Sequence, residues 1–209
     1  MKRILLALVF LVAGFLIVQY LIRKDKETKN VSQSVSRHSL VFNQGIASLM
    51  DEYYKMTAAF VRWDSAAVNT HVSAVRQQMD SIRISELAQD STLDRPRAEN
   101  LLNAARGNIS AMAAQTGLDA KRQLLNTFTL NLYAFLDVIK YDRSRLYLQK
   151  CPMAFNDTGA GVWISAGDSI RNPYLGLHHP QYGKGMLKCG ENESVLDYTK
   201  GPDAKKQED

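Results

Sequence analysis

The chain has 209 residues, of which 45% are hydrophobic and 22% charged, a composition that is typical of a folded protein and excludes an intrinsically disordered one. The formal net charge is +5, but six basic and two acidic side chains lie within the first 29 residues, which leaves 20 basic and 19 acidic side chains for the rest. A nucleic-acid-binding domain needs a clustered basic face of its own. The composition therefore argues against a nucleic-acid partner, and the length predicts one folded domain.

Residues 1–24 are predicted to form an N-terminal transmembrane anchor. The segment Ile4–Ile22 has no charged residue, and as a helix it would reach about 30 Å, the thickness of the hydrocarbon core of a bilayer. Its apolar run continues beyond the small residues Ala13 and Gly14, and no cysteine for lipid attachment follows it. We therefore expect an uncleaved, single-pass anchor that holds the protein at the membrane.

The orientation of this anchor rests on two opposing signals. Lys and Arg flank the span on both sides and are more numerous after it, which taken literally favours a cytoplasmic domain. Long domains can be translocated regardless of flanking charge, however, and the cysteine usage suits an oxidising compartment. We predict an inner-membrane protein with a periplasmic domain.

Polar segments flank the predicted domain, which covers residues 40–198. Residues 25–39 are rich in Ser, Lys and Asn and are predicted to form a tether, in which the side chain of His38 is expected to be solvated. Residues 199–209 are predicted to be a charged, disordered tail.

Four amphipathic helical patterns follow the tether, because apolar residues return at alternating steps of four and three. Asp64 or Ser65 is placed as an N-cap of the second helix, the third opens near Pro96 and closes at Gly117, and the fourth starts at Asp119. The four stripes are Phe42, Ile46, Leu49, Tyr53, Met56 and Phe60; Val68, Val72, Val75, Met79 and Ile82; Ala98, Leu102, Ala105, Ile109 and Met112; and Leu124, Phe128, Leu132, Phe135 and Ile139.

Short connections make consecutive helices antiparallel neighbours, so the expected fold is mainly α, an up-down four-helix bundle followed by a small C-terminal β module. The four methionines within the helices are expected to fill the core: Met50, Met56, Met79 and Met112.

The C-terminal module, from about residue 145 to residue 198, is rich in Gly, Pro, Asn and aromatic residues. Arg145–Gln149 alternates like a half-buried strand, Asn156–Gly159 supplies a turn, and Val162–Ser165 can return as a second strand. We predict a β-hairpin from about Leu146 to Ser165, with Trp163 in its core and the remaining chain irregular.

This module also contains the residues that are best suited to chemistry. They are both cysteines, an adjacent pair of histidines and the only methionines outside the helices and the initiator: Cys151, Met153, His178, His179, Met186 and Cys189. Thiolate and thioether are soft ligands suited to Cu(I), and imidazole can complete such a site. We predict a site for Cu(I) or another soft metal ion, with the four sulfur side chains as ligands and the histidines as auxiliary ligands.

A disulfide between Cys151 and Cys189 is the alternative. Closing a loop of this length contributes about 4 kcal/mol to stability in the chain-entropy model, which is a sufficient reason for two cysteines to exist. Two cysteines alone do not distinguish a disulfide from a metal site. The sequence has no Cys-x-x-Cys motif and no set of nucleophile, base and orienting residue, so an enzyme is not expected.

The last third of the chain resembles a known family. The runs Cys151–Phe155, Gly161–Ser165, Ile170–Gly176 and Met186–Gly190 are similar to the domain of unknown function numbered 3347, which is frequent in Bacteroidetes. Members resemble modules found alone or attached to the periplasmic adaptor subunits of heavy-metal efflux systems. The resemblance implies an envelope location, an efflux or envelope protein as partner, and a role in metal binding. The stretch Leu177–Tyr182 is longer than in compact members.

Two functions therefore stay open. The first is a membrane-anchored envelope protein with a soft-metal, copper-type binding or sensing module. The second is a non-catalytic structural or protein-interaction module stapled by the Cys151–Cys189 disulfide.

Overall fold

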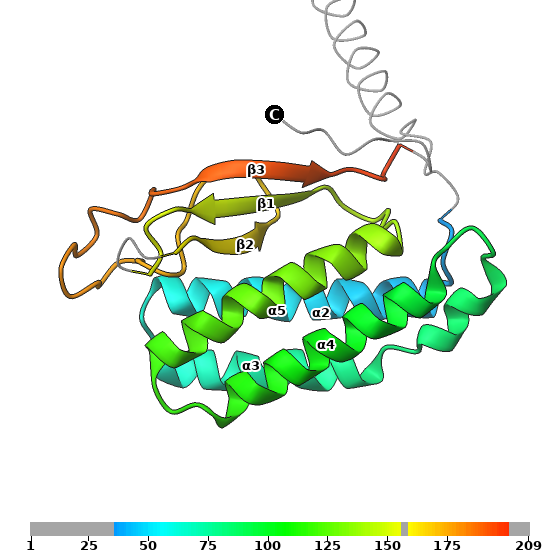
Figure 1. Cartoon of the computed structure of the whole chain (residues 1–209), viewed down its shortest axis with the longest axis horizontal. Helices are drawn as coiled ribbons and strands as arrows, with labels where there is room; N and C mark the ends of the chain where they lie inside the picture. The colour runs from blue at the N-terminus through cyan, green and yellow to red at the C-terminus, as the bar shows by residue number, and fades with distance from the viewer. Residues whose placement is uncertain (1–35, 156–158, 201–209) are drawn as a thin grey trace, which may run out of the picture. The chain divides into compact units, whose positions relative to one another are not determined.

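The computed structural model describes residues 36–155 and 159–200 (Figure 1). The chain divides into two units, residues 1–35 and 36–209, and only the second contains described residues. The predicted anchor, the tether up to residue 35 and residues 201–209 of the predicted tail lie outside the described residues. In the two described ranges, no helix is both long and apolar enough to cross a membrane.

Four α-helices occupy the described residues at the places where the apolar patterns predict them. They are α2 (Leu40–Val61), α3 (Ser65–Ser81), α4 (Arg95–Ala114) and α5 (Leu118–Val138). The side chains of Ser39, Asp64 and Asp94 cap the first three, each accepting a hydrogen bond from the backbone N–H three residues on. A short 3₁₀ helix, η1 (Ile84–Gln89), is not predicted, because six residues are too few to show a helical period.

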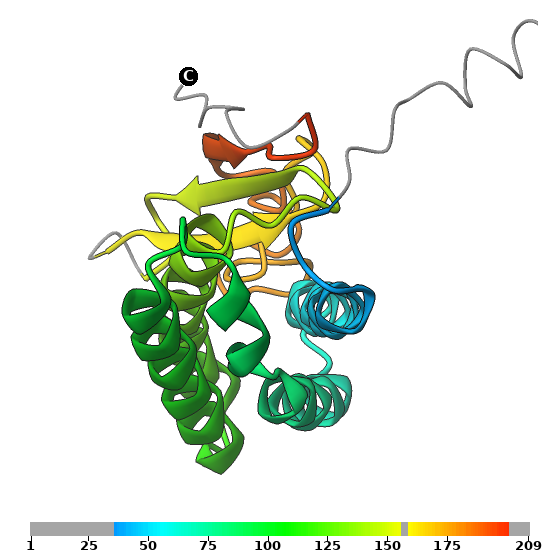
Figure 2. The ribbon, with the colours of Figure 1, turned by 90° about the vertical axis from the view of Figure 1, so that its right-hand side faces the viewer.

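Consecutive helices pack against each other, α2 on α3, α3 on α4 and α4 on α5 (Figures 1 and 2). The predicted stripes form the core, and all four helical methionines are buried, which confirms that part of the prediction. One position of the α5 stripe is wrong: Leu125 is fully buried where the pattern predicts Leu124, which is half-buried.

Three antiparallel strands follow the helices: β1 (Leu146–Cys151), β2 (Gly161–Ser165) and β3 (Glu191–Leu196), in the order β2-β1-β3. The β1–β2 hairpin is confirmed, with Trp163 opposite Gln149 in the register and buried. β3 is a correction, because this stretch is predicted to be irregular. Its first half is polar and partly exposed, so it shows no alternation of apolar residues.

The edge strand β2 lies against α5 and α2, and helix side chains satisfy its outer backbone groups (Figure 1). The backbone N–H of Val162 donates to Oδ1 of Asn126, at 3.0 Å, and the N–H of Ile164 donates to the hydroxyl of Tyr53, also at 3.0 Å. The Tyr53 hydroxyl also bonds to Thr129 on α5, at 2.9 Å. A single side chain of α2 therefore joins both helices to the sheet.

The last residues of the predicted tether belong to the folded unit. The Ser36 hydroxyl and the backbone N–H of Arg37 donate to the carboxylate of Asp142, at 2.9 and 3.1 Å. His38 is half-buried and its Nε2 bonds to the carbonyl of Ile139, at 2.7 Å, in place of the solvated side chain expected from the sequence. These partners lie about one hundred residues away along the chain, so composition gave no sign of them.

Candidate functional site

The two cysteines meet at one end of the sheet. Cys151 is the last residue of β1, opposite Gly161 of β2, and Cys189 lies two residues before β3. Their Sγ atoms are 3.0 Å apart. Cys151 is fully buried, whereas Cys189 is half-buried. The pair is therefore close enough to act on one species, and Cys189 is its accessible member.

Asn172 fixes the backbone that carries Cys189. Its side chain is fully buried, with Oδ1 accepting from the backbone N–H groups of Tyr174 and Leu175 and Nδ2 donating to the carbonyl of Cys189, at 2.8, 3.0 and 2.9 Å. Its own N–H donates to the carbonyl of Leu187, at 2.9 Å. A buried amide with these partners holds its segment in one conformation, because breaking any bond leaves a polar group unpaired.

The predicted methionine ligands lie beside this pair in sequence. Met153 and Met186 are both half-buried and pack against the hydrophobic core. The backbone N–H of Cys189 donates to the carbonyl of Met186, at 3.0 Å, so the turn that their spacing requires is present. Their role as metal ligands stays a prediction.

The two histidines have different surroundings. His178 is exposed. The ring of His179 stacks on Tyr182, with centroids 4.9 Å apart, and meets Trp63 edge-on at 5.7 Å. In the part of the chain that the structure describes, no three or more His, Cys, Asp or Glu side chains gather as ligands for a metal ion. The prediction of both histidines as auxiliary ligands therefore gains no support from these contacts.

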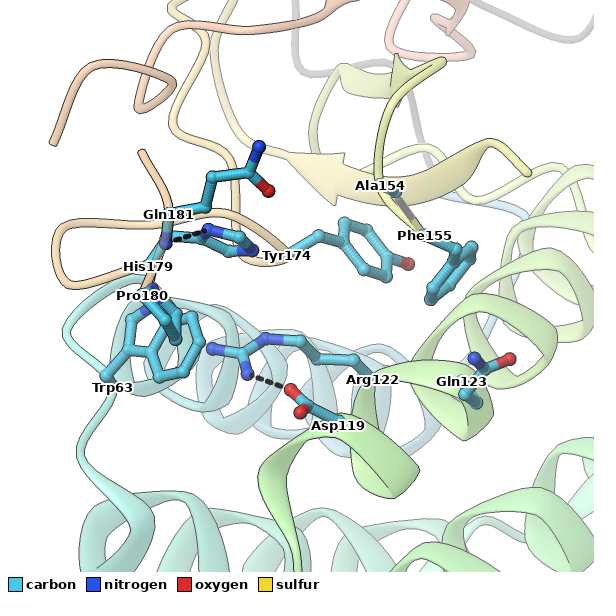
Figure 3. A pocket seen from close by; sticks show the side chains of 10 residues that line it. All are labelled: Trp63, Asp119, Arg122, Gln123, Ala154, Phe155, Tyr174, His179, Pro180 and Gln181. Carbon is cyan, nitrogen blue, oxygen red and sulfur yellow. Dashed lines mark hydrogen bonds and ion pairs between the residues drawn. The ribbon is translucent and has the colours of Figure 1, made fainter. Parts of the chain in front are cut away.

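A second site lies at the first turns of α5. A cavity of about 480 Å³ is lined by aromatic side chains, by Arg122 with its neighbours on α5, and by the loop after His179 (Figure 3). Its lining residues are Trp63, Asp119, Arg122, Gln123, Ala154, Phe155, Tyr174, His179, Pro180 and Gln181.

Arg122 is a buried cation in the wall of this cavity. Its Nε donates to the carbonyl of Pro173 at 3.1 Å, Nη1 to the Asp119 carboxylate at 3.0 Å, and Nη2 to the carbonyl of Phe60 at 3.3 Å. The guanidinium also lies 3.9 Å from the centroid of the Trp63 ring. The side chain of Arg122 is 4% exposed, whereas that of its counter-ion Asp119 is 91% exposed. Burial lowers the pKa of Arg122, and the charge of Asp119 only partly opposes this effect.

The loop that contributes His179 to the cavity is bonded to the end of α2 and to the turn that follows it. Nε1 of Trp63 donates to the carbonyl of Leu175, at 3.0 Å, and the N–H of Leu177 donates to the carbonyl of Val61, at 2.8 Å. Trp63 has a φ of 58°, which is unusual for a bulky residue and is maintained only where the surroundings over-determine it. The aromatic wall is therefore held in place before any ligand enters.

Tyr174 links the two sites. Its ring lines the cavity, and its hydroxyl donates to the carbonyl of Val162, at 2.6 Å. Burial raises the pKa of Tyr174 well above its usual value, with smaller contributions from Tyr53 and Cys151. Tyr174 is therefore a wall of the cavity and also lies close enough to Cys151 for their charges to interact.

The cavity is not predicted from the sequence, although one residue signals it. Arg122 lies three residues before the buried Leu125, so it falls on the apolar stripe of α5, where a charged residue is unusual unless it is paired. Trp63 gave no such signal, because its partner Leu175 is 112 residues further along the chain.

Comparison of the chain with protein-family models, with curated proteins and with solved structures finds no match.

Proposed function

We propose that the chain is a membrane-anchored envelope protein whose C-terminal module binds Cu(I) or another soft metal ion through Cys151 and Cys189. The 3.0 Å separation of the two sulfurs carries this proposal, because it brings two soft donors together from positions 38 residues apart. The thioethers of Met153 and Met186 are the further soft donors nearest to them in sequence.

The surroundings of the pair suit capture of a metal ion. The half-buried Cys189 gives access from solvent, and Asn172 holds the backbone of Cys189, so only the thiol side chains have to move apart to admit an ion. Thiolates are the binding form, so protons compete with the metal and affinity falls as the pH drops. A bound soft cation would offset the negative charge of the buried Cys151 thiolate and of its half-buried partner.

The disulfide-stapled interaction module is the second candidate, and the same separation of sulfurs favours it. An S–S bond is about 2.05 Å long, so a small shift of either side chain from the present positions would allow the bond to form. That bond would tie the end of β1 to the residues before β3.

The setting of the module is part of the proposal. Residues 1–24 would anchor it in the inner membrane, with the domain in the periplasm and an efflux or envelope protein as partner, as the resemblance to the domain of unknown function numbered 3347 implies. We assign no catalytic activity to it. The sequential packing of α2 to α5 supports an up-down four-helix bundle as the platform.

Competition with a chromophoric Cu(I) chelator tests the metal site on the reduced, full-length protein. We expect one Cu(I) per chain, binding that weakens at least about tenfold in Cys151→Ser or Cys189→Ser, and a smaller loss in Met153→Leu or Met186→Leu, because a thioether carries no charge. Met112→Leu, in the core of α4, is the matched control and should bind as the native chain does.

The competing function gives a different set of results. Intact mass and thiol counting without reductant would find no free thiols, and reductant would lower the stability of the protein. Equal competition by the native chain and the double Cys→Ser variant would rule out the metal site.

A further inference from the structure

We propose that the cavity beside Arg122 binds a small organic carboxylate with an aromatic body. This binding site is separate from the cysteine pair and does not depend on the proposed metal function. Four properties of the cavity carry the inference: an incompletely paired buried cation, aromatic walls, suitable volume and a rigid frame.

The first property is the state of Arg122. A guanidinium has five N–H donors, and among the described residues only three of them meet acceptors, those on Pro173, Asp119 and Phe60. A buried cation is normally compensated by a comparably buried anion, but Asp119 is almost fully exposed. A carboxylate entering the cavity would add a negative charge shielded from water, which the exposed Asp119 does not provide, and would accept the remaining hydrogen bonds.

The walls determine what the carboxylate is attached to. In Figure 3 the Arg122 side chain runs beneath Tyr174, with Trp63 at one end of the cavity and Phe155 at the other. Two of the wall rings, Phe155 and Tyr174, already meet edge-on, with centroids 5.3 Å apart. Such surfaces bury an aromatic body well, whereas a bare phosphate or sulfate would leave them in contact with water.

The size and rigidity of the cavity agree with a small ligand. Its volume of about 480 Å³ lies in the usual range for small-molecule sites. Trp63 is fixed by its bond to Leu175 and by the guanidinium against its face, so little ordering would be needed on binding.

Two other interpretations of Arg122 account for less. A purely structural clamp explains its bonds to the carbonyls of Pro173 and Phe60 but leaves the other donors and the open volume without a role. A cationic ligand attracted by the aromatic rings would meet the positive charge of Arg122 itself.

The test uses phenylacetate as probe, its neutral isostere phenylacetamide as control, and inorganic phosphate as the bare oxyanion. Binding to the ¹⁵N-labelled full-length protein is followed at low salt through the two tryptophan indole N–H signals. We expect phenylacetate to bind at least about tenfold more tightly than phenylacetamide or phosphate, since hydrogen bonds between two charged groups are stronger than those to a neutral amide. It should move the indole signal of Trp63, and leave that of the buried Trp163 nearly unchanged.

Arg122→Gln should remove the preference for phenylacetate over phenylacetamide. Variants at exposed positions keep the test valid even if that variant fails to fold. Asp119→Asn removes the competing carboxylate and should tighten phenylacetate binding about two- to fivefold, whereas Gln123→Glu adds a negative charge at the rim and should weaken it by a similar factor. Phenylacetamide binding should not respond to either change. Equal affinity for the acid and the amide, tighter binding of phosphate, or failure of these two variants to shift affinity in opposite directions would overturn the proposal.

Discussion

Two glycines of the C-terminal loop have the same backbone conformation but different surroundings. Gly176 and Gly183 have φ values of +58° and +52°, a region that residues with a side chain rarely adopt. A Cβ added at Gly176 would lie 2.5 Å from the carbonyl oxygen of Val61 and 2.8 Å from Nε1 of Trp63, whereas one added at Gly183 meets nothing within 4 Å. Only Gly176 therefore lies where the loop approaches the helices too closely for any side chain.

Substitution of each glycine by alanine separates the two effects. Gly183→Ala should lower the free energy of unfolding by about 1 kcal/mol, the penalty for a left-handed alanine. Gly176→Ala should lower it by about 3 kcal/mol or more, because the clash with backbone adds to that penalty. Urea denaturation of the two variants measures the difference, and equal losses would show that the loop is not held against Val61.

The individual residues that sequence alone could predict are those whose role is local. The helical methionines and the apolar stripes follow from the spacing of residues within one helix, so their burial was predictable. Arg122 and Trp63 depend on carbonyls of Pro173 and Leu175, which only the tertiary fold brings to them. The sequence allowed us to propose that Cys151 and Cys189 lie close together. It did not allow us to deduce it, because two cysteines have several possible roles.

Among the elements, β2 depends most on one hydroxyl. The side chain of Tyr53 is fully buried, its hydroxyl accepts the N–H of Ile164, and burial raises its pKa to about 12. The hydroxyl of the next residue, Tyr54, is buried as well but has no hydrogen-bond partner in the described part of the chain. These adjacent tyrosines form a matched pair for testing how the sheet is attached to α2.

We expect opposite results from the two Tyr→Phe substitutions. Tyr53→Phe should lower the free energy of unfolding by about 1–3 kcal/mol, because the N–H of Ile164 and the hydroxyl of Thr129 lose a partner in a dry environment. Tyr54→Phe should leave stability unchanged or raise it slightly, since it removes an unsatisfied polar atom. Chemical denaturation gives both values. A larger loss in Tyr54→Phe than in Tyr53→Phe would contradict this attachment of β2.

Elements with a clear period were predictable and those without one were not. The four helices and the β1–β2 hairpin appear in the sequence as repeating apolar positions bounded by caps and turns. β3 is recognisable only from its pairing with β1, where Leu196 lies opposite Leu146 and Val195 opposite Tyr147. Its polar first half, Glu191 to Glu193, hides the alternation until the partner strand is known.

At the scale of the whole molecule, one segment serves both candidate sites. Asn172 holds the carbonyl of Cys189, the next residue Pro173 accepts from Arg122, and Tyr174 lines the cavity. The same segment is bonded to the end of α2 through Leu175 and Leu177. The helices therefore act as a rigid support that positions the C-terminal module, and damage to this segment would affect both sites together.

The boundary of the folded unit gives a prediction for the whole chain. A protein that begins at Asn30 lacks the predicted anchor but retains Ser36, Arg37 and His38, so it should be soluble, monodisperse and mainly helical by circular dichroism. A protein that begins at Ser39 should be less stable by about 1–3 kcal/mol, because the buried carboxylate of Asp142 loses the hydroxyl of Ser36 and the N–H of Arg37.

Thermal and urea denaturation test this boundary. Each truncated protein is measured with and without the substitution Asp142→Asn. Because Asp142 has both donors only in the longer protein, Asp142→Asn should lower the stability of that protein and have little effect on the shorter one. If both truncated proteins are equally stable, the folded unit begins at Ser39 and the contacts of residues 36–38 contribute nothing. The longer protein contains every contact described for the helices and the sheet. If it is nevertheless insoluble or unfolded, the domain does not fold without residues 1–29.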